Sequence, residues 1–139
     1  LQDTGFHYFS FIMMALAIET MGAFLDTKPF RAQSQSKKRF SAAIRKLFDR
    51  RYIIDNRTDW LYEKLRNHFA HTMVPSSWLI LTSVASNRTG KEHLSFHDDK
   101  LVLVAEDFYN DMKKAAERLI RLIEQGKAEG KRIILNTDK

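Results

Sequence analysis

The segment from Tyr62 to His71 brings together side chains that can cleave a phosphodiester bond without a metal ion. Arg66 carries a permanent charge and can bind a phosphate through two N–H groups, and His71 can take up or release a proton near neutral pH. Cleavage of RNA by its own 2′-hydroxyl needs a general base, a cation beside the phosphate and a proton for the leaving oxygen. Arg66 and His71 are therefore the first candidates for catalytic residues.

The geometry of an α-helix sets a condition on this pair. Five residues rotate the chain by about 140° beyond one full turn, at about 100° per residue, so Arg66 and His71 do not share a helix face. Asn67 and His71 are four residues apart and do share a face, which allows Asn67 to orient the imidazole. Arg66 and His71 converge only if the helix ends or bends near Pro75, or if a second copy of the chain contributes one of them. We favour the second copy.

Glu19 is a further candidate, because its spacing from Leu16 and Ala23 places a carboxylate on or beside the apolar stripe of a predicted helix. A buried carboxylate needs a partner. Glu19 either pairs with Arg66 and supports the geometry of the site or lies at the solvated edge of the stripe, and we favour the solvated edge.

The histidines offer a metal-based alternative that we do not favour. His68 and His71 are three residues apart on a predicted helix, and His93 and His97 are four apart near a predicted hairpin. No carboxylate or thiolate completes a recognised set of metal ligands with either pair. We therefore expect no metal ion and no other cofactor, and we expect His68 at the surface and His93 and His97 in the hairpin and a loop.

Basic residues concentrate between Arg31 and Arg57. A predicted helix from about Lys37 to Asp49 places Phe40, Ile44, Leu47 and Phe48 on one face and basic side chains on the other. The residues that we expect to contact nucleic acid are Lys37, Lys38, Arg39, Arg45, Lys46, Arg50 and Arg51. Solvation alone also explains an exposed basic face, and that interpretation stays open. No aromatic stacking platform is evident within this helix, because its aromatic residues belong to the apolar stripe.

Two further helices are expected upstream of Pro75. The first runs from Phe6 to Leu25, and the third opens at Thr58 or Asp59 and ends before Pro75. Apolar residues recur in both at three- or four-residue spacing. The predicted stripe of the first helix is Phe9, Ile12, Met13, Leu16, Thr20, Ala23 and Phe24, and that of the third is Leu61, Leu65, Phe69 and Met73.

After Pro75 the pattern predicts a β-hairpin and then a last helix. Trp78 to Ser83 and His93 to Phe96 are the two expected strands, joined by turn-forming residues. The helix is expected after Asp98 and Asp99, whose charges favour a helix start, and Gly126 is expected to end it. Its predicted stripe is Leu101, Val104, Ala105, Phe108, Met112, Ala115, Leu119, Leu122 and Ile123.

These elements predict a mainly all-α protein, namely an up-and-down bundle of about four helices with one β-hairpin between the third and fourth helices. The 139 residues form one domain, 1–139, and a content of 44% hydrophobic and 29% charged residues excludes a disordered or collagen-like chain. The net charge of +6 makes nucleic acid the first candidate partner. Polar residues interrupt the apolar run from Phe6 to Leu25, so we expect no membrane segment, and the absence of cysteine suits a cytoplasmic protein.

Arg66-Asn67, followed after three residues by His71, resembles the signature of the HEPN superfamily, in which an arginine and a polar residue precede a histidine late in a helix of a small bundle. The segment from Ile18 to Gly22 in the first helix and the hairpin after the motif extend this resemblance over most of the chain. It implies a homodimer whose paired motifs form one cleft that cleaves RNA to 2′,3′-cyclic phosphate and 5′-hydroxyl ends. Arg66 and His71 would then be catalytic and Asn67 supporting.

The resemblance also implies a biological setting, since many HEPN proteins are toxins of toxin–antitoxin or phage-defence systems. An antitoxin or a nucleotidyltransferase would then be a partner. Other members have lost catalysis, so the alternative is a non-catalytic dimeric module that binds nucleic acid or an acidic protein. RNA is the expected ligand of the nuclease.

Overall fold

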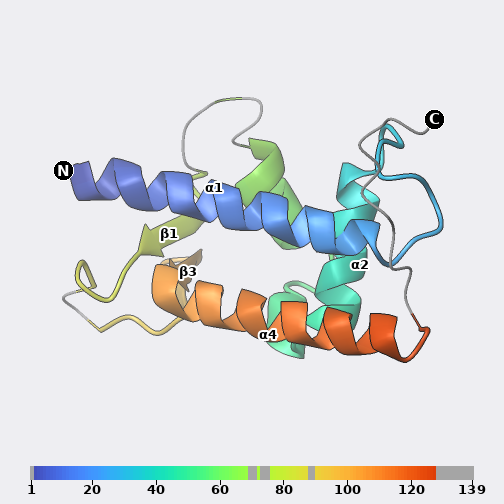
Figure 1. Ribbon diagram of the computed structural model, residues 1–139. Helices are drawn as coiled ribbons and strands as arrows, with labels where there is room; N and C mark the ends of the chain where they lie inside the picture. The colour runs from blue at the N-terminus through green and yellow to red at the C-terminus, as the bar shows by residue number, and fades with distance from the viewer. Residues whose placement is uncertain (1, 69–71, 73–75, 88–89, 128–139) are drawn as a thin grey trace.

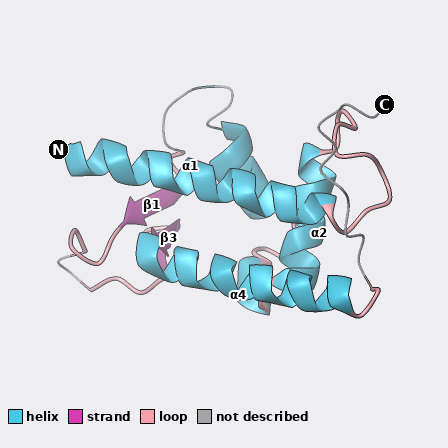
Figure 2. Cartoon of the chain, viewed as in Figure 1, coloured by secondary structure: helices cyan, strands magenta, loops and turns pink. Residues whose placement is uncertain are grey.

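The computed structural model describes residues 2–68, 72, 76–87 and 90–127, with the backbone alone for residues 2–7 (Figure 1). The chain is mainly helical and carries a small three-stranded sheet (Figure 2). The elements in chain order are α1 (Gln2–Ala23), α2 (Ser36–Leu47), the 3₁₀-helix η1 (Arg50–Tyr52), the π-helix η2 (Tyr62–Asn67), β1 (Leu79–Thr82), β2 (Phe96–His97), β3 (Lys100–Val104) and α4 (Ala105–Glu124).

Helices α1, α2 and α4 pack against one another around a common apolar core (Figure 1). The rings of Phe11 in α1 and Phe108 in α4 stack with centroids 5.9 Å apart, and Phe108 also stacks with Tyr52, with centroids 6.0 Å apart. The apolar face predicted for α2 is confirmed, since Phe40, Ile44, Leu47 and Phe48 are all buried. Arg118 of α4 donates a hydrogen bond to the carbonyl of Leu47, which satisfies a carbonyl left free at the end of α2.

The predicted apolar stripe of α1 is wrong for four of its residues, because Phe9, Met13, Leu16 and Thr20 are exposed. Ile12 and Ala23 of the stripe are buried as predicted, together with Phe11, Met14, Ala15, Ile18 and Met21. Apolar residues occur on all sides of this helix, so the spacing alone did not identify the face that packs. The exposed side of α1 therefore presents large apolar side chains to solvent.

Gly22 permits the close approach of α1 and α2. A Cβ atom at this position would lie 1.8 Å from the carbonyl oxygen of Arg39. Contact at that distance is impossible without moving backbone, so the crossing requires glycine. The approach places the last turns of α1 against the start of α2.

The predicted hairpin is also wrong, because the two expected strands do not pair with each other. β1 pairs in parallel with β3, from Leu79 opposite Leu101 to Thr82 opposite Val104, and the strand order is β1-β3-β2. β2 pairs antiparallel with β3, so the hairpin joins β2 to β3. Leu101 to Val104 form a continuous buried run, which is typical of a central strand between two neighbours.

Asp98 and Asp99 therefore form the turn of this hairpin and do not start the last helix. Their φ angles of 52° and 65° lie in the left-handed region that a two-residue hairpin turn requires. α4 begins later, at Ala105. Its predicted end is confirmed: Gly126, with φ of 72°, donates to the carbonyl of Ile123, and Lys127 donates to that of Leu122.

The run from Phe6 to Leu25 lies mostly within α1, whose inner face is buried in the core. No helix in the described part of the chain is both long enough and apolar enough to cross a membrane.

Candidate functional site

The segment that carries the predicted motif is helical from residue 60, in agreement with the expected start after Asp59. It does not continue as a regular α-helix, because Tyr62–Asn67 forms the π-helix η2, and the backbone N–H of His68 donates to the carbonyl of Glu63. The rotation of about 100° per residue assumed for an α-helix does not hold through this turn. Single π-helical turns inside α-helices are frequent at functional sites. His71, Phe69, Met73 and Pro75 lie outside the described residues.

Glu19 pairs with Arg66. The carboxylate oxygen Oε1 of Glu19 accepts a hydrogen bond from Nε of Arg66 at 3.1 Å, and Oε2 accepts one from the hydroxyl of Ser36 at 2.8 Å. The two charged side chains are 20% and 22% exposed, so the pair is largely shielded from water. Of the two interpretations of Glu19, the structure therefore bears out the pairing with Arg66 and not the favoured solvated edge.

Three elements meet at this carboxylate. Glu19 lies three residues before Gly22, so the contact that glycine permits between α1 and α2 brings Ser36 and Glu19 together. Arg66 reaches the same carboxylate from η2. The bond through Nε leaves both Nη groups of Arg66 without a hydrogen bond to any residue in the described part of the chain, and such Nη groups suit an anion.

Asn67 is held by Glu63, because its Nδ2 donates to Oε1 of that residue at 3.2 Å. The other carboxylate oxygen of Glu63 forms an ion pair with Nζ of Lys37 at 3.2 Å. The predicted role of Asn67 toward His71 stays a prediction. Asn67 is instead linked to the start of α2.

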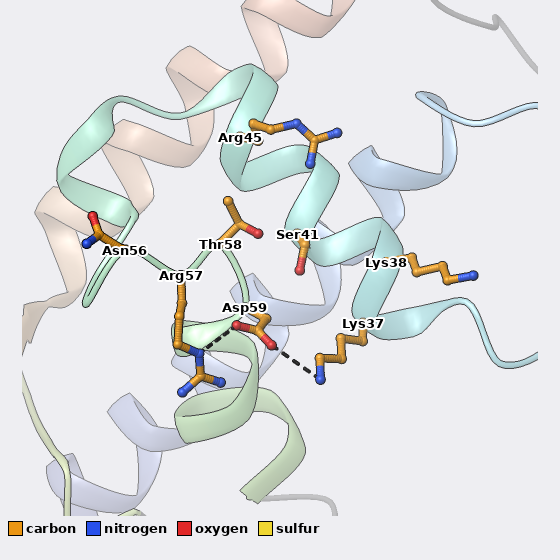
Figure 3. A pocket seen from close by; sticks show the side chains of 8 residues that line it. All are labelled: Lys37, Lys38, Ser41, Arg45, Asn56, Arg57, Thr58 and Asp59. Carbon is orange, nitrogen blue, oxygen red and sulfur yellow. Dashed lines mark hydrogen bonds and ion pairs between the residues drawn. The ribbon is translucent and has the colours of Figure 1, made fainter.

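An open groove of about 670 Å³ lies between α2 and the turn that precedes η2 (Figure 3). Four basic residues line it, and Lys37 and Arg57 point toward Asp59 from opposite sides, at 3.2 Å and 2.9 Å. Lys38 and Arg45 form no ion pair with a described residue. The lining residues are Lys37, Lys38, Ser41, Arg45, Asn56, Arg57, Thr58 and Asp59.

Arg57 and Asn56 are groove residues that the sequence did not single out. They sit at a tight turn in which Asp55 and Asn56 both have φ of 56°, and Ile54 and Arg57 exchange backbone hydrogen bonds. An Asp-Asn pair favours such a turn, and this was the signal available in the sequence. The turn places Arg57 and Thr58 opposite the basic face of α2 (Figure 3).

Arg39 does not belong to the predicted nucleic-acid surface. Its side chain is 8% exposed and forms an ion pair with Asp26 at 2.9 Å. Its Nη1 and Nη2 donate to the carbonyls of Phe30 and Pro29 at 2.9 Å and 2.7 Å. Position 39 faces inward because it lies one residue before Phe40 on a helix that is packed on two sides, and the guanidinium holds the connection between α1 and α2.

The remaining predicted contacts lie at the surface and outside the groove. Lys46 and Arg50 are exposed. Arg51 is exposed as well, but it pairs with Asp49 at 3.1 Å, and that interaction raises the pKa of Arg51.

His93 forms a buried cluster with Tyr52 and Asp111, and it precedes strand β2 and does not lie in the predicted hairpin strand from His93 to Phe96. The Tyr52 hydroxyl donates to Asp111 at 2.6 Å and lies 2.9 Å from Nε2 of His93, whose Nδ1 accepts from the backbone N–H of Val104 at 3.0 Å. Burial lowers the pKa of His93, and Asp111 only partly offsets this. Burial and Asp111 raise the pKa of Tyr52. No spacing rule connects three residues so far apart in the sequence.

A grouping of three or more residues that could hold a metal ion does not occur within the described ranges. Comparison of the chain with protein-family models, with curated proteins and with solved structures finds no match.

Proposed function

We propose that the protein is a metal-independent endoribonuclease of the HEPN type, in which Arg66 binds the scissile phosphate and His71 transfers a proton. The observation that carries this proposal is the hydrogen bonding of the Arg66 guanidinium. Glu19 fixes the guanidinium through Nε, and its outer edge keeps the two N–H groups that suit two phosphate oxygens. A positioned cation of this kind stabilises the charge that develops on the phosphate during cleavage.

In the proposed reaction, the 2′-oxygen forms a bond to phosphorus while the bond from phosphorus to the 5′-oxygen breaks. One imidazole takes the proton of the 2′-hydroxyl, and another supplies a proton to the leaving 5′-oxygen. The products are a 2′,3′-cyclic phosphate and a 5′-hydroxyl. A homodimer supplies two copies of His71, one for each proton transfer, with Asn67 in a supporting role.

The groove extends the site toward a longer substrate. Lys38 and Arg45 project from α2 without ion-pair partners among the described residues and suit the phosphates of an RNA backbone. Lys37 links this groove to the motif, because it contacts both Asp59 in the groove and Glu63 beside Asn67. A toxin or defence role, with an antitoxin or nucleotidyltransferase as partner, belongs to the same proposal through the HEPN resemblance.

The test is cleavage of a labelled mixture of tRNA and mRNA in excess EDTA. Wild-type protein should cut, and Arg66→Ala and His71→Ala should each lower the rate by about 100-fold or more, the scale of losing a group that stabilises transition-state charge. Arg121→Ala is the matched control, since Arg121 is an exposed arginine on α4. Cyclic-phosphate ends would establish the reaction class. A folded wild-type dimer that cuts neither RNA would refute the catalytic proposal.

The groove favours a second candidate, a non-catalytic module that binds nucleic acid. The basic residues that line the groove can bind a phosphate backbone without Arg66 or His71. In that case Arg66→Ala leaves RNA affinity unchanged, whereas Lys38→Ala and Arg45→Ala weaken it. Both variants should also flatten the dependence of affinity on salt, because fewer counterions are released.

A further inference from the structure

Aromatic side chains lie beside Lys64, in the same helix as Arg66, and two of them are exposed. Trp78 and Phe96 are 49% and 53% exposed, whereas Trp60 is 6% exposed and lies against the edge of Phe96, with centroids 6.3 Å apart. Nζ of Lys64 lies 4.7 Å from the centre of the Trp78 ring and 6.0 Å from that of Trp60. The aromatic–lysine patch therefore consists of Trp60, Lys64, Trp78 and Phe96.

The patch is built on ordered backbone from three parts of the fold. Trp78 precedes β1, and its backbone accepts a hydrogen bond from Leu101 at 2.9 Å while its N–H donates to Ser76 at 3.1 Å. Phe96 belongs to β2, and Lys64 belongs to η2. Rings held in this way lose little conformational freedom when a flat ligand stacks on them.

The side chains of the patch indicate which class of ligand it binds. Large aromatic side chains left in water mark interaction surfaces, and a lysine among them favours a ligand that combines negative charge with a flat ring. An unpaired base with its adjoining phosphate has both properties, and aromatic side chains beside basic ones are how proteins hold single-stranded nucleic acid. A net charge of +6 attracts the same polymer.

We propose that an unpaired base of single-stranded RNA stacks on the exposed rings of Trp78 and Phe96, with Lys64 contacting the adjoining phosphate. This inference rests on the proposed function only in taking RNA as the ligand. The segment from Arg57 to Asn67 contributes residues to the groove, to the patch and to the Arg66 site. Paired bases cannot stack in this way, and the substrate is therefore a single-stranded segment such as a loop.

The experiment measures binding of a 2′-O-methyl oligouridylate, which has no free 2′-hydroxyl to attack the phosphate, to the full chain. Titration should quench tryptophan fluorescence, and a duplex of the same length should bind at least about 10-fold more weakly. Trp78→Leu should remove most of the quenching and lower the affinity by about 10- to 100-fold, the scale of losing one stacked base. Trp78→Phe, which keeps a ring, should restore the affinity. Tyr109→Leu is the matched control, because Tyr109 is 53% exposed on α4.

The outcomes separate this inference from the proposed function. Loss of stacking in Trp78→Leu, with no cleavage of unmodified RNA by wild type, supports the inference and refutes the nuclease. Cleavage with an affinity unchanged in Trp78→Leu and Phe96→Leu overturns the inference and leaves the nuclease standing. Absence of RNA binding overturns both. If Trp78→Leu and Phe96→Leu turn a dimer into monomers without changing the affinity for RNA, the patch is an interface between copies and the stacking inference alone is overturned.

Discussion

Two arginines that are poorly exposed in this protein differ in how many of their N–H groups are already bonded. Arg39 donates through Nε, Nη1 and Nη2 to Asp26 and two backbone carbonyls, and its side chain is only 8% exposed, so it offers little to a ligand. Arg66 uses only Nε among the described residues, on Glu19. The first arginine therefore supports the fold, and the second keeps unbonded Nη groups among the described residues, as the proposed function requires.

Arg39→Ala should lower the free energy of unfolding by about 2–4 kcal/mol, because it removes a guanidinium that is only 8% exposed together with its hydrogen bonds to Asp26 and to the carbonyls of Phe30 and Pro29. Urea unfolding followed by circular dichroism measures the change. Lys38→Ala, one residue earlier and exposed, should change stability by less than about 0.5 kcal/mol but weaken RNA binding. If Arg39→Ala instead weakened RNA binding without lowering stability, Arg39 would belong to the nucleic-acid surface after all.

Replacement of Glu19 tests whether its carboxylate positions the guanidinium of Arg66. Glu19→Ala should reduce the rate of RNA cleavage by about 10- to 100-fold, since a misplaced catalytic group costs rate without being removed. Glu19→Gln, which can still accept from Arg66 and Ser36, should recover much of that rate. Single-turnover kinetics with saturating RNA reports the effect on the chemical step. Equal rates in all three proteins would show that the ion pair only stabilises the fold.

His93 predicts a dependence of stability on pH. Its pKa is lowered in the folded protein, so between that value and about 6.5 the unfolded chain binds more protons. Stability is then complete above about pH 6.5 and is lost as the pH falls, because a proton on Nδ1 would face the N–H of Val104. Chemical unfolding from pH 8 to 5 measures this. His93→Gln should flatten the profile, whereas His97→Gln, at an exposed position, should not.

At the scale of elements, the crossing of α1 and α2 determines whether the site exists. Gly22 lets the two helices approach, and Glu19 and Ser36 then meet on the same side of the contact. The π-helical turn of η2 brings Arg66 to the same carboxylate. Distortion of either element would separate the three side chains without changing any of them.

Gly22→Ala tests this dependence. The added methyl would collide with the Arg39 carbonyl, and we expect a net loss of about 1–3 kcal/mol in stability despite the better helix propensity of alanine. RNA cleavage should fall as well, because the helices must move apart. Thr20→Ala is the control, since Thr20 is exposed and bonds only within its own helix. Thermal unfolding and the EDTA cleavage assay report the two effects, and a variant as stable as wild type would contradict the close approach.

At the scale of the whole molecule, the exposed face of α1 suits a second copy of the chain. Phe9, Met13 and Leu16 lie on one side of this helix, and their spacing gives a continuous apolar strip. The proposed reaction also needs two histidines. A homodimer that buries this strip would cover the exposed apolar side chains and would also supply the second histidine.

Met13→Glu should therefore convert a dimer into monomers, because dimerisation would bury the new carboxylate without a partner. Sedimentation velocity measures the oligomeric state, and circular dichroism should show unchanged helix content. Ile120→Glu, at an exposed apolar position of α4, should remain dimeric. A wild-type protein that is monomeric at high concentration would contradict the proposed arrangement.

The sequence by itself predicted the features that depend on neighbours along the chain. The amphipathic face of α2, the buried residues of α4 from Phe108 onward, the end of that helix at Gly126 and the start near Asp59 follow from helical spacing and local capping. Helical periodicity does not identify the buried face of α1, where all sides are apolar. It also predicts a helix from Leu101 onward, where the structure has the strand Lys100–Val104.

Only the tertiary structure decided which residues become partners across the chain. It joined Glu19 to Arg66 over 47 positions, His93 to Tyr52 over 41, and turned Arg39 inward. The physical reason is that such contacts depend on how closely helices cross and in what order strands pair. Those distances are determined by packing over the whole core, which no local spacing of residue types encodes.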